Sequence, residues 1–149
     1  MIKIKYLLIA ALLLTAASPV TAKSKQKKNI PQRVYMFGFA ASFNDTIVHF
    51  TEIQAVDSAW LSSKKTFLLG RDNYSYQLRD YLTRQQMPYR TCVIFFDCKL
   101  SRLQKIFLKV KNKYSIGKKG MPTNNDIRII PRDSFHFSPI NMSDTSNGE

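Results

Sequence analysis

Alternating apolar and polar positions predict a β-hairpin near the start of the folded part of the chain. Between Arg33 and Phe43 the side chains on one face are Tyr35, Phe37, Phe39, Ala41 and Phe43, which follow the two-residue period of a strand. Asn44-Asp45 is suited to a tight turn because both residue types tolerate a positive φ, and Thr46–Ile53 returns as the second strand. The expected cross-strand pairs are Phe39 with Phe50 and Ala41 with Val48.

Two later segments have the period of an amphipathic helix. Tyr74, Leu78 and Leu82 recur at four-residue spacing before Met87-Pro88, and this predicts a first helix that ends ahead of the proline. The same kind of stripe over Leu100–Tyr114 predicts a second and longer helix. Residues 54–71 show neither period, so we expect a turn or a short helix there, followed by a short extended piece that ends at Gly70.

Two short apolar runs complete the predicted fold. Arg90–Phe96 is nearly continuous in apolar residues, as in a strand buried on both faces, and Asp126–Ile130 is a last strand closed by Pro131. The order is β-β-α-β-α-β. We expect an α/β (α+β) fold, a two-layer sandwich in which a mixed sheet of about four strands carries both helices on one face.

The first 22 residues have the three parts of a secretory signal peptide. Lys3 and Lys5 precede a nine-residue apolar run, Tyr6–Leu14, and a small-residue cleavage site follows at Val20-Thr21-Ala22. A spanning helix needs about 20 apolar residues, so an uncleaved anchor is the weaker alternative. We therefore expect export to the periplasm or beyond the cell.

The remaining chain divides into three parts by composition. Residues 23–32 form a lysine-rich lead-in that we expect to be disordered, residues 33–140 a single domain of ordinary size, and residues 141–149 a polar, disordered tail. The signal peptide holds two of the 23 basic residues and none of the 10 acidic ones, so the mature chain has a net charge of +11. This charge favours anionic partners, although plain solubility charge is a competing explanation.

The basic residues are densest on the second predicted helix and the loop after it. Either this surface is a solvated helix face, or its cations bind an anionic polymer or headgroup. Phe107 and Tyr114 lie on the apolar stripe and are not free to stack on bases; together with export, this disfavours nucleic acid. The candidate binding residues are Lys99, Arg102, Lys105, Lys109, Lys113, Lys118 and Lys119.

The sequence contains no recognisable catalytic or metal-binding set. Cys92 and Cys98 are separated by a predicted strand of about 20 Å, too long for a disulfide unless the chain turns back sharply, so we expect two unpaired thiols. Two cysteines with the distant His49 and His136 do not make a zinc site, and no cofactor is expected. The remaining enzymatic alternative is a hydrolase that uses Cys98 or His49.

The segments Tyr35–Ile53 and Tyr74–Tyr81 resemble uncharacterised small exported proteins of Gram-negative bacteria. The resemblance implies an envelope location and brings no activity with it. We expect a non-enzymatic binding module for an anionic glycan, glycolipid or membrane surface, or for a protein partner. The alternatives are the hydrolase and a subunit of an envelope complex.

Overall fold

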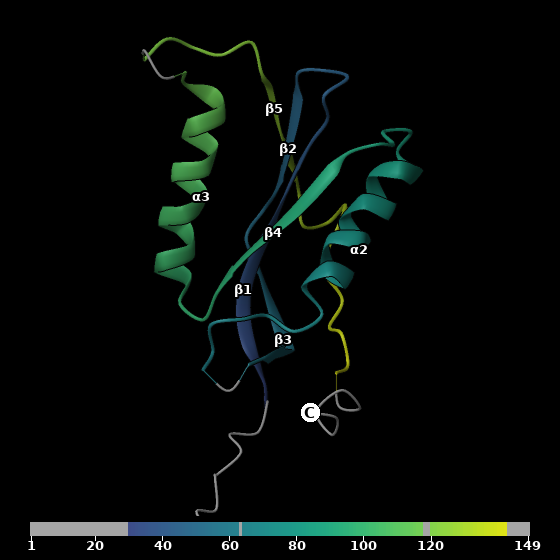
Figure 1. The fold of residues 1–149 in the computed structure, drawn as a ribbon, viewed down its shortest axis with the longest axis vertical. Coiled ribbons are helices and arrows are strands. Elements are labelled where there is room, and N and C mark those ends of the chain that lie inside the picture. Colours follow the sequence, from purple (N-terminus) through teal and green to yellow (C-terminus); the bar gives the residue numbers. More distant parts are fainter. Residues whose placement is uncertain (1–29, 63, 118–119, 143–149) are drawn as a thin grey trace, which may run out of the picture.

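The structure is a computed structural model that describes residues 30–62, 64–117 and 120–142. The predicted signal peptide, residues 23–29 of the lead-in, Lys118, Lys119 and residues 143–149 lie outside the described residues. The elements, in chain order, are β1 (Ile30–Ala41), β2 (Ile47–Thr51), β3 (Gln54–Leu61), α2 (Arg71–Arg84), β4 (Thr91–Asp97), α3 (Leu100–Ser115) and β5 (Asp126–Ile130) (Figure 1). None of the helices in these residues is long and apolar enough to cross a membrane.

The sheet is built around the long strand β1. Strand β4 pairs antiparallel along one edge of β1, and β2 and β3 follow each other along the other edge. Strand β5 then adds parallel to β2. The result is a mixed open sheet in which β4 lies on one side of β1, β2 and β3 lie on the other side, and β5 lies beyond β2. This arrangement confirms the predicted α+β class.

The predicted hairpin register is confirmed, with Phe39 opposite Phe50 and Ala41 opposite Val48. The turn is wider than the expected Asn44-Asp45 pair, because strand pairing stops at Ala41 and leaves a loop that is held by its own side chains. In this loop Asn44 donates its backbone N–H to Ser42 Oγ, and Ile47 donates to Asp45 Oδ1.

Strand β3 occupies a segment for which the sequence predicted a turn or a short helix. Ser58 has a φ of 59°, and the pairing with β1 shifts register in this region. The shift breaks the alternation of buried and exposed positions, so the two-residue period is hidden in the sequence. The same pairing extends β1 back to Ile30, three residues ahead of the predicted start of order.

The two helices cover opposite faces of the sheet, and this corrects the expectation that both lie on one face. Gly38 and its even-numbered neighbours in β1 face α2, where Leu78 lies close to the glycine. Phe37 and Phe39 face α3, and the rings of Phe37 and Phe107 meet edge to face at 5.0 Å. The sheet therefore lies between the helices (Figure 1), because both faces of β1 are apolar and each needs its own cover.

The α2 face is also covered by the chain after β5. Phe135 and Phe137 are buried there. Gln54 fastens this segment to β3: its amide N–H donates to the Phe135 carbonyl, and its amide oxygen accepts from the Phe137 N–H. We call this cover, residues 131–142, the C-terminal segment.

Candidate anion-binding face

Helix α3 is amphipathic along its whole length. The apolar stripe packs on β1 and β2: Leu103 is fully buried, and the ring of Tyr114 lies 4.7 Å from that of Phe39. The opposite side carries basic residues, and the sequence has no acidic residue between Asp97 and Asp126. The helix itself therefore carries no negative charge to offset its basic residues.

Four of the predicted residues line up on one side of α3. Arg102, Lys105, Lys109 and Lys113 follow one another at three- and four-residue spacing, which places them on one helix face; we call them the basic stripe. All four are exposed. Lys99 directly precedes the helix as its N-cap residue, and Lys118 and Lys119 lie outside the described residues.

One member of the basic stripe is already paired. Arg102 Nη2 donates to Asp97 Oδ1 at 2.8 Å, and the same carboxylate oxygen accepts the backbone N–H of Lys99. Within the described part of the chain, Lys105, Lys109 and Lys113 have no ion-pair partner. Three lysines are thus left free to bind an external anion.

The basic stripe borders a groove between α3 and β4. The groove has a volume of about 520 Å³. Its floor includes Val93 and Phe95 of β4, both half-buried, and Phe95 stacks on Phe37 at 4.9 Å. The full lining is Phe39, Val93, Phe95, Lys109, Val110, Lys113 and Tyr114; we call it the α3–β4 groove.

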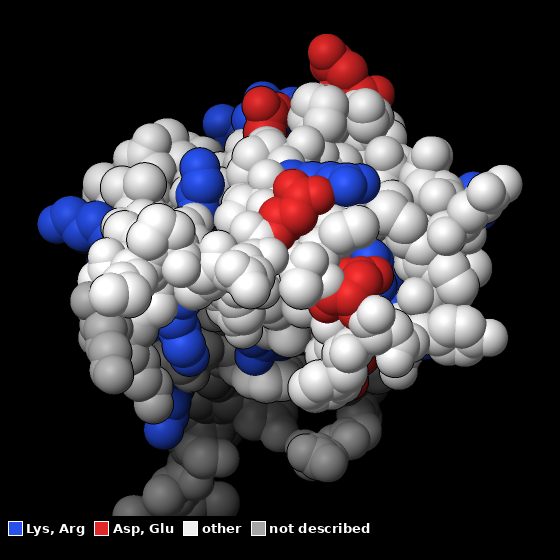
Figure 2. All heavy atoms as spheres, turned by 90° about the horizontal axis from the view of Figure 1, so that it is seen from above, with Lys and Arg blue, Asp and Glu red and all other residues white. Residues whose placement is uncertain are grey.

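Charge is distributed unevenly over the end of the molecule seen in Figure 2. Acidic side chains lie in the middle and at the top of the view, several of them against arginine or lysine, whereas basic side chains on the left, the α3 side, have no acidic neighbour in view. On this end of the molecule, the α3 side therefore shows positive charge without an acidic neighbour in view.

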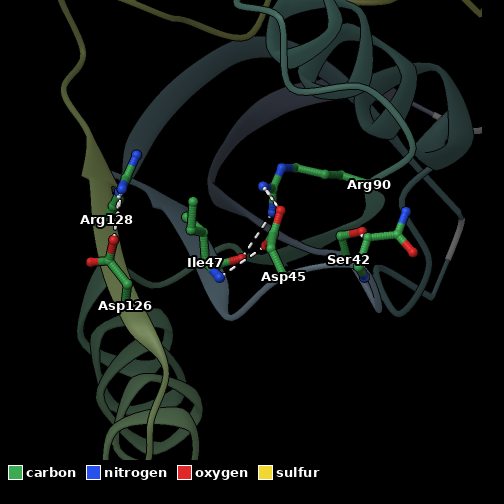
Figure 3. Close-up of polar contacts among 7 residues, drawn as sticks. Ser42, Asp45, Ile47, Arg90, Asp126 and Arg128 are labelled. Atoms are coloured by element: carbon green, nitrogen blue, oxygen red, sulfur yellow. Dashed lines mark hydrogen bonds and ion pairs between the residues drawn. The ribbon is translucent and has the colours of Figure 1, made fainter.

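A second polar cluster lies where β1 and β2 meet, and no local sequence pattern indicates it. The side chain of Arg90 is only 3% exposed; its Nη2 donates to Asp45 Oδ2 at 2.6 Å and its Nη1 to the Ile47 carbonyl at 2.8 Å. Figure 3 shows this arginine, which directly precedes β4, reaching Asp45 in the loop; the Arg128–Asp126 pair of β5 lies on the other side of Ile47. Arg90 thus ties the hairpin loop to β4.

His49 lies beside this cluster and is 3% exposed. Burial lowers the pKa of His49 to about 4, and the positive charges of Arg90 and Arg128 contribute in the same direction. Its Nδ1 and Arg90 Nε are buried without a hydrogen-bond partner among the described residues. The imidazole is therefore neutral at pH 7 and closed off from solvent, which suits a structural role.

The two residues of the enzymatic alternative lie far apart. Asp97, next to Cys98, pairs with Tyr35, whereas His49 pairs with Ala40. Tyr35 and Ala40 are five residues apart along β1, a distance of about 16 Å. Cys98 and His49 are therefore too far apart to form a nucleophile–base pair.

Both cysteines are free thiols. Burial raises the pKa of Cys92 to about 11, so its reactive thiolate form is scarce at neutral pH. Among the described residues, no three His, Cys, Asp or Glu side chains come close enough together to hold a metal ion.

The position of β4 corrects the expectation of a strand buried on both faces. It is an edge strand, and only Ile94 is fully buried. The sequence therefore indicated the lysines of the site but not its apolar floor. Apolar composition alone does not distinguish a central strand from an edge strand half-covered by a helix.

Compared with protein-family models, with curated proteins and with solved structures, the chain matches none of them. The function is therefore argued from the geometry of the basic stripe and the α3–β4 groove.

Proposed function

We propose that this protein is exported and binds an anionic component of the cell envelope through the basic stripe of α3. The observation that carries the proposal is the row of three lysines, Lys105, Lys109 and Lys113, which have no ion-pair partner among the described residues and lie on a helix that contains no acidic residue. A solvated helix face in a mixed-charge protein normally intersperses both signs. The predicted signal peptide supports a partner outside the cytoplasm.

The spacing of the lysines suits an anion with several charges. Lys105 and Lys113 are eight residues apart, which is about 12 Å along a helix. A phosphate-bearing glycolipid or polymer presents negative charges over such a length, whereas a single small anion does not. The binding would be largely electrostatic and therefore weakened by salt.

The binding proposal is tested with long-chain polyphosphate as the probe and affinity measured over a range of salt concentrations. The stripe variant replaces three lysines: Lys105→Gln, Lys109→Gln and Lys113→Gln. The matched control removes the same charge away from α3, at exposed positions: Lys64→Gln, Lys65→Gln and Arg84→Gln. Because a lysine near an anionic surface contributes about 1 kcal/mol, the stripe variant is expected to lose about tenfold to a hundredfold in affinity.

The control variant is expected to lose much less affinity. Equal losses in the two variants would show that net charge alone drives binding and would contradict a site on α3. An affinity that does not change with salt would contradict the electrostatic mechanism.

The export proposal is tested separately. The full chain is expressed in a Gram-negative bacterium, and the mass and N-terminus of the protein are determined in the periplasmic fraction. A product that begins at Lys23 is expected. Full-length protein in the cytoplasm or the membrane fraction would contradict cleavage after Ala22.

A further inference from the structure

The α3–β4 groove combines an apolar floor with a cationic rim, and few ligands satisfy both. Val93, Phe95 and Val110 offer apolar surface, and Lys109 and Lys113 stand at the edge of the same groove. We propose that the groove binds a single acyl chain that carries a phosphate head group. This inference rests on the proposed function, because it names the class of anion that the basic stripe holds.

The dimensions of the groove suit a ligand of this size. Its volume of about 520 Å³ falls within the range of about 300–1,000 Å³ that is usual for small-molecule sites. The floor is well supported, since Phe95 stacks on Phe37 and Tyr114 packs on Phe39. The chain would lie along Val93 and Phe95 and remove their half-exposed surface from water.

The two lysines at the rim favour phosphate over a carboxylate. Lys109 and Lys113 are four residues apart, so they are neighbours on successive turns of the helix. A phosphate monoester carries a charge of about −1.5 to −2 at neutral pH and three acceptor oxygens. It can therefore pair with both ammonium groups at once, whereas a carboxylate balances only one.

An added peptide strand fits this edge less well. Gly38, which lies opposite Ile94, directs its N–H toward Thr51 on β2, so the Ile94 carbonyl points to the free edge of β4. There it already accepts two hydrogen bonds from Arg71, at 3.1 and 2.7 Å. A strand added along β4 would have to displace this arginine from the middle of the edge.

The test measures binding by isothermal titration calorimetry with three probes. Dodecyl phosphate, kept below its micelle-forming concentration, carries both the chain and the head group. Methyl phosphate carries the head group alone, and dodecyl maltoside carries the same chain without charge. Dodecyl phosphate is expected to bind at least about tenfold more tightly than either of the others, because several methylene groups and two ion pairs act together.

Two variants separate the two parts of the site. Val93→Gln with Val110→Gln makes the groove polar, and it is expected to lower dodecyl phosphate affinity about tenfold while polyphosphate affinity stays unchanged. Lys109→Gln with Lys113→Gln is expected to lower the affinity for both ligands. The control, Lys111→Gln on the other flank of α3, should change neither; thermal unfolding verifies that each variant is folded.

The outcomes distinguish this inference from the proposed function. If polyphosphate binds at the basic stripe but dodecyl phosphate binds no more tightly than methyl phosphate, the acyl-chain inference is overturned and the proposed function stands. If dodecyl maltoside binds as tightly as dodecyl phosphate, the role of the rim lysines is overturned. If the wild type binds neither polyphosphate nor dodecyl phosphate, the proposed function itself fails.

A final comparison addresses the competing class of ligand. An extended acidic peptide that binds more tightly than dodecyl phosphate, and protects the β4 backbone amides from hydrogen exchange, would overturn the lipid assignment in favour of strand addition. Arg71→Gln sharpens the distinction, since it frees the edge carbonyl and should not change the affinity for dodecyl phosphate.

Discussion

The two faces of the sheet are covered in different ways. On one face α2 and the C-terminal segment together enclose the core, with Gln54 and Gln77 hydrogen-bonded to the backbone of that segment. On the other face α3 stands alone, and apolar side chains remain open on both of its flanks. Leu108 is 57% exposed and Ile129 42% exposed.

Because of this difference, the α2 face mainly stabilises the fold, and the α3 face offers a surface for binding. The α2 face buries its apolar residues almost completely, including Tyr74, Leu78 and Leu82, so it contributes most to the free energy of folding. The α3 face keeps apolar surface beside unpaired lysines. Surface left open in this way is typical of a site that is completed by a ligand.

The largest effect should come from matched truncations on the two helices. Leu78 of α2 is fully buried, so Leu78→Ala is expected to lower the free energy of unfolding by about 3 kcal/mol. Leu108→Ala on α3 should change it by no more than about 0.5 kcal/mol. Urea unfolding measures both values, and comparable losses would show that the α3 flank is as tightly packed as the α2 core.

The next effect concerns the dependence of stability on pH. The pKa of His49 is about 4 in the folded protein and 6.5 as an ordinary value, so the unfolded state binds more protons between these limits. The contribution of neutral His49 to stability should therefore be fully present above pH 6.5. The free energy of unfolding should fall by about 3 kcal/mol as pH decreases to 4. The reduction is complete below that pH.

Urea unfolding at a series of pH values measures the slope of the unfolding free energy against pH. His49→Gln should remove most of it between pH 4 and 6.5. The matched control, His136→Gln, replaces an exposed histidine and should leave the slope in place. A slope that persists without His49 would assign it to other groups.

A smaller effect is expected at Gly38, where β1 approaches α2. A Cβ added there would lie 2.5 Å from Leu78 Cδ2 and 3.3 Å from both Phe137 and Thr51. Gly38→Ala should lower the free energy of unfolding by about 1–3 kcal/mol through overpacking. The double variant with Leu78→Ala should be less destabilised than the sum of the two single changes, since the new methyl group enters the space vacated by leucine.

Additive losses in that double-mutant cycle would contradict the close packing of β1 against α2. Ala41→Gly, at the end of the same strand, provides a matched control that changes the backbone without touching this contact.

The smallest effect on stability should come from the basic stripe. Lys109 and Lys113 are exposed like charges at four-residue spacing, and such pairs are destabilising by about 0.2–0.5 kcal/mol. Lys109→Gln with Lys113→Gln should therefore leave the unfolding free energy unchanged or raise it by a few tenths of a kcal/mol, while anion binding weakens. A clear loss of stability would show that these lysines support the fold.

Much of this molecule follows from local sequence patterns. The register of Phe39 with Phe50, the limits of α3 within one residue and those of β5 were predictable, because each depends on a short periodicity and on residues close in the chain. The basic stripe was equally visible, since the spacing of its lysines defines a helix face wherever the helix lies.

Tertiary structure alone decided how these pieces meet. The sequence does not specify which face of the sheet each helix covers, since both faces of β1 are apolar and the choice depends on the path of the crossovers. It also hid β3, whose bulge at Ser58 breaks the period, and the burial of Arg90, whose partner Asp45 lies 45 residues away. The apolar floor of the α3–β4 groove exists only because β4 lies at an edge, and strand order is a long-range property that no local pattern records.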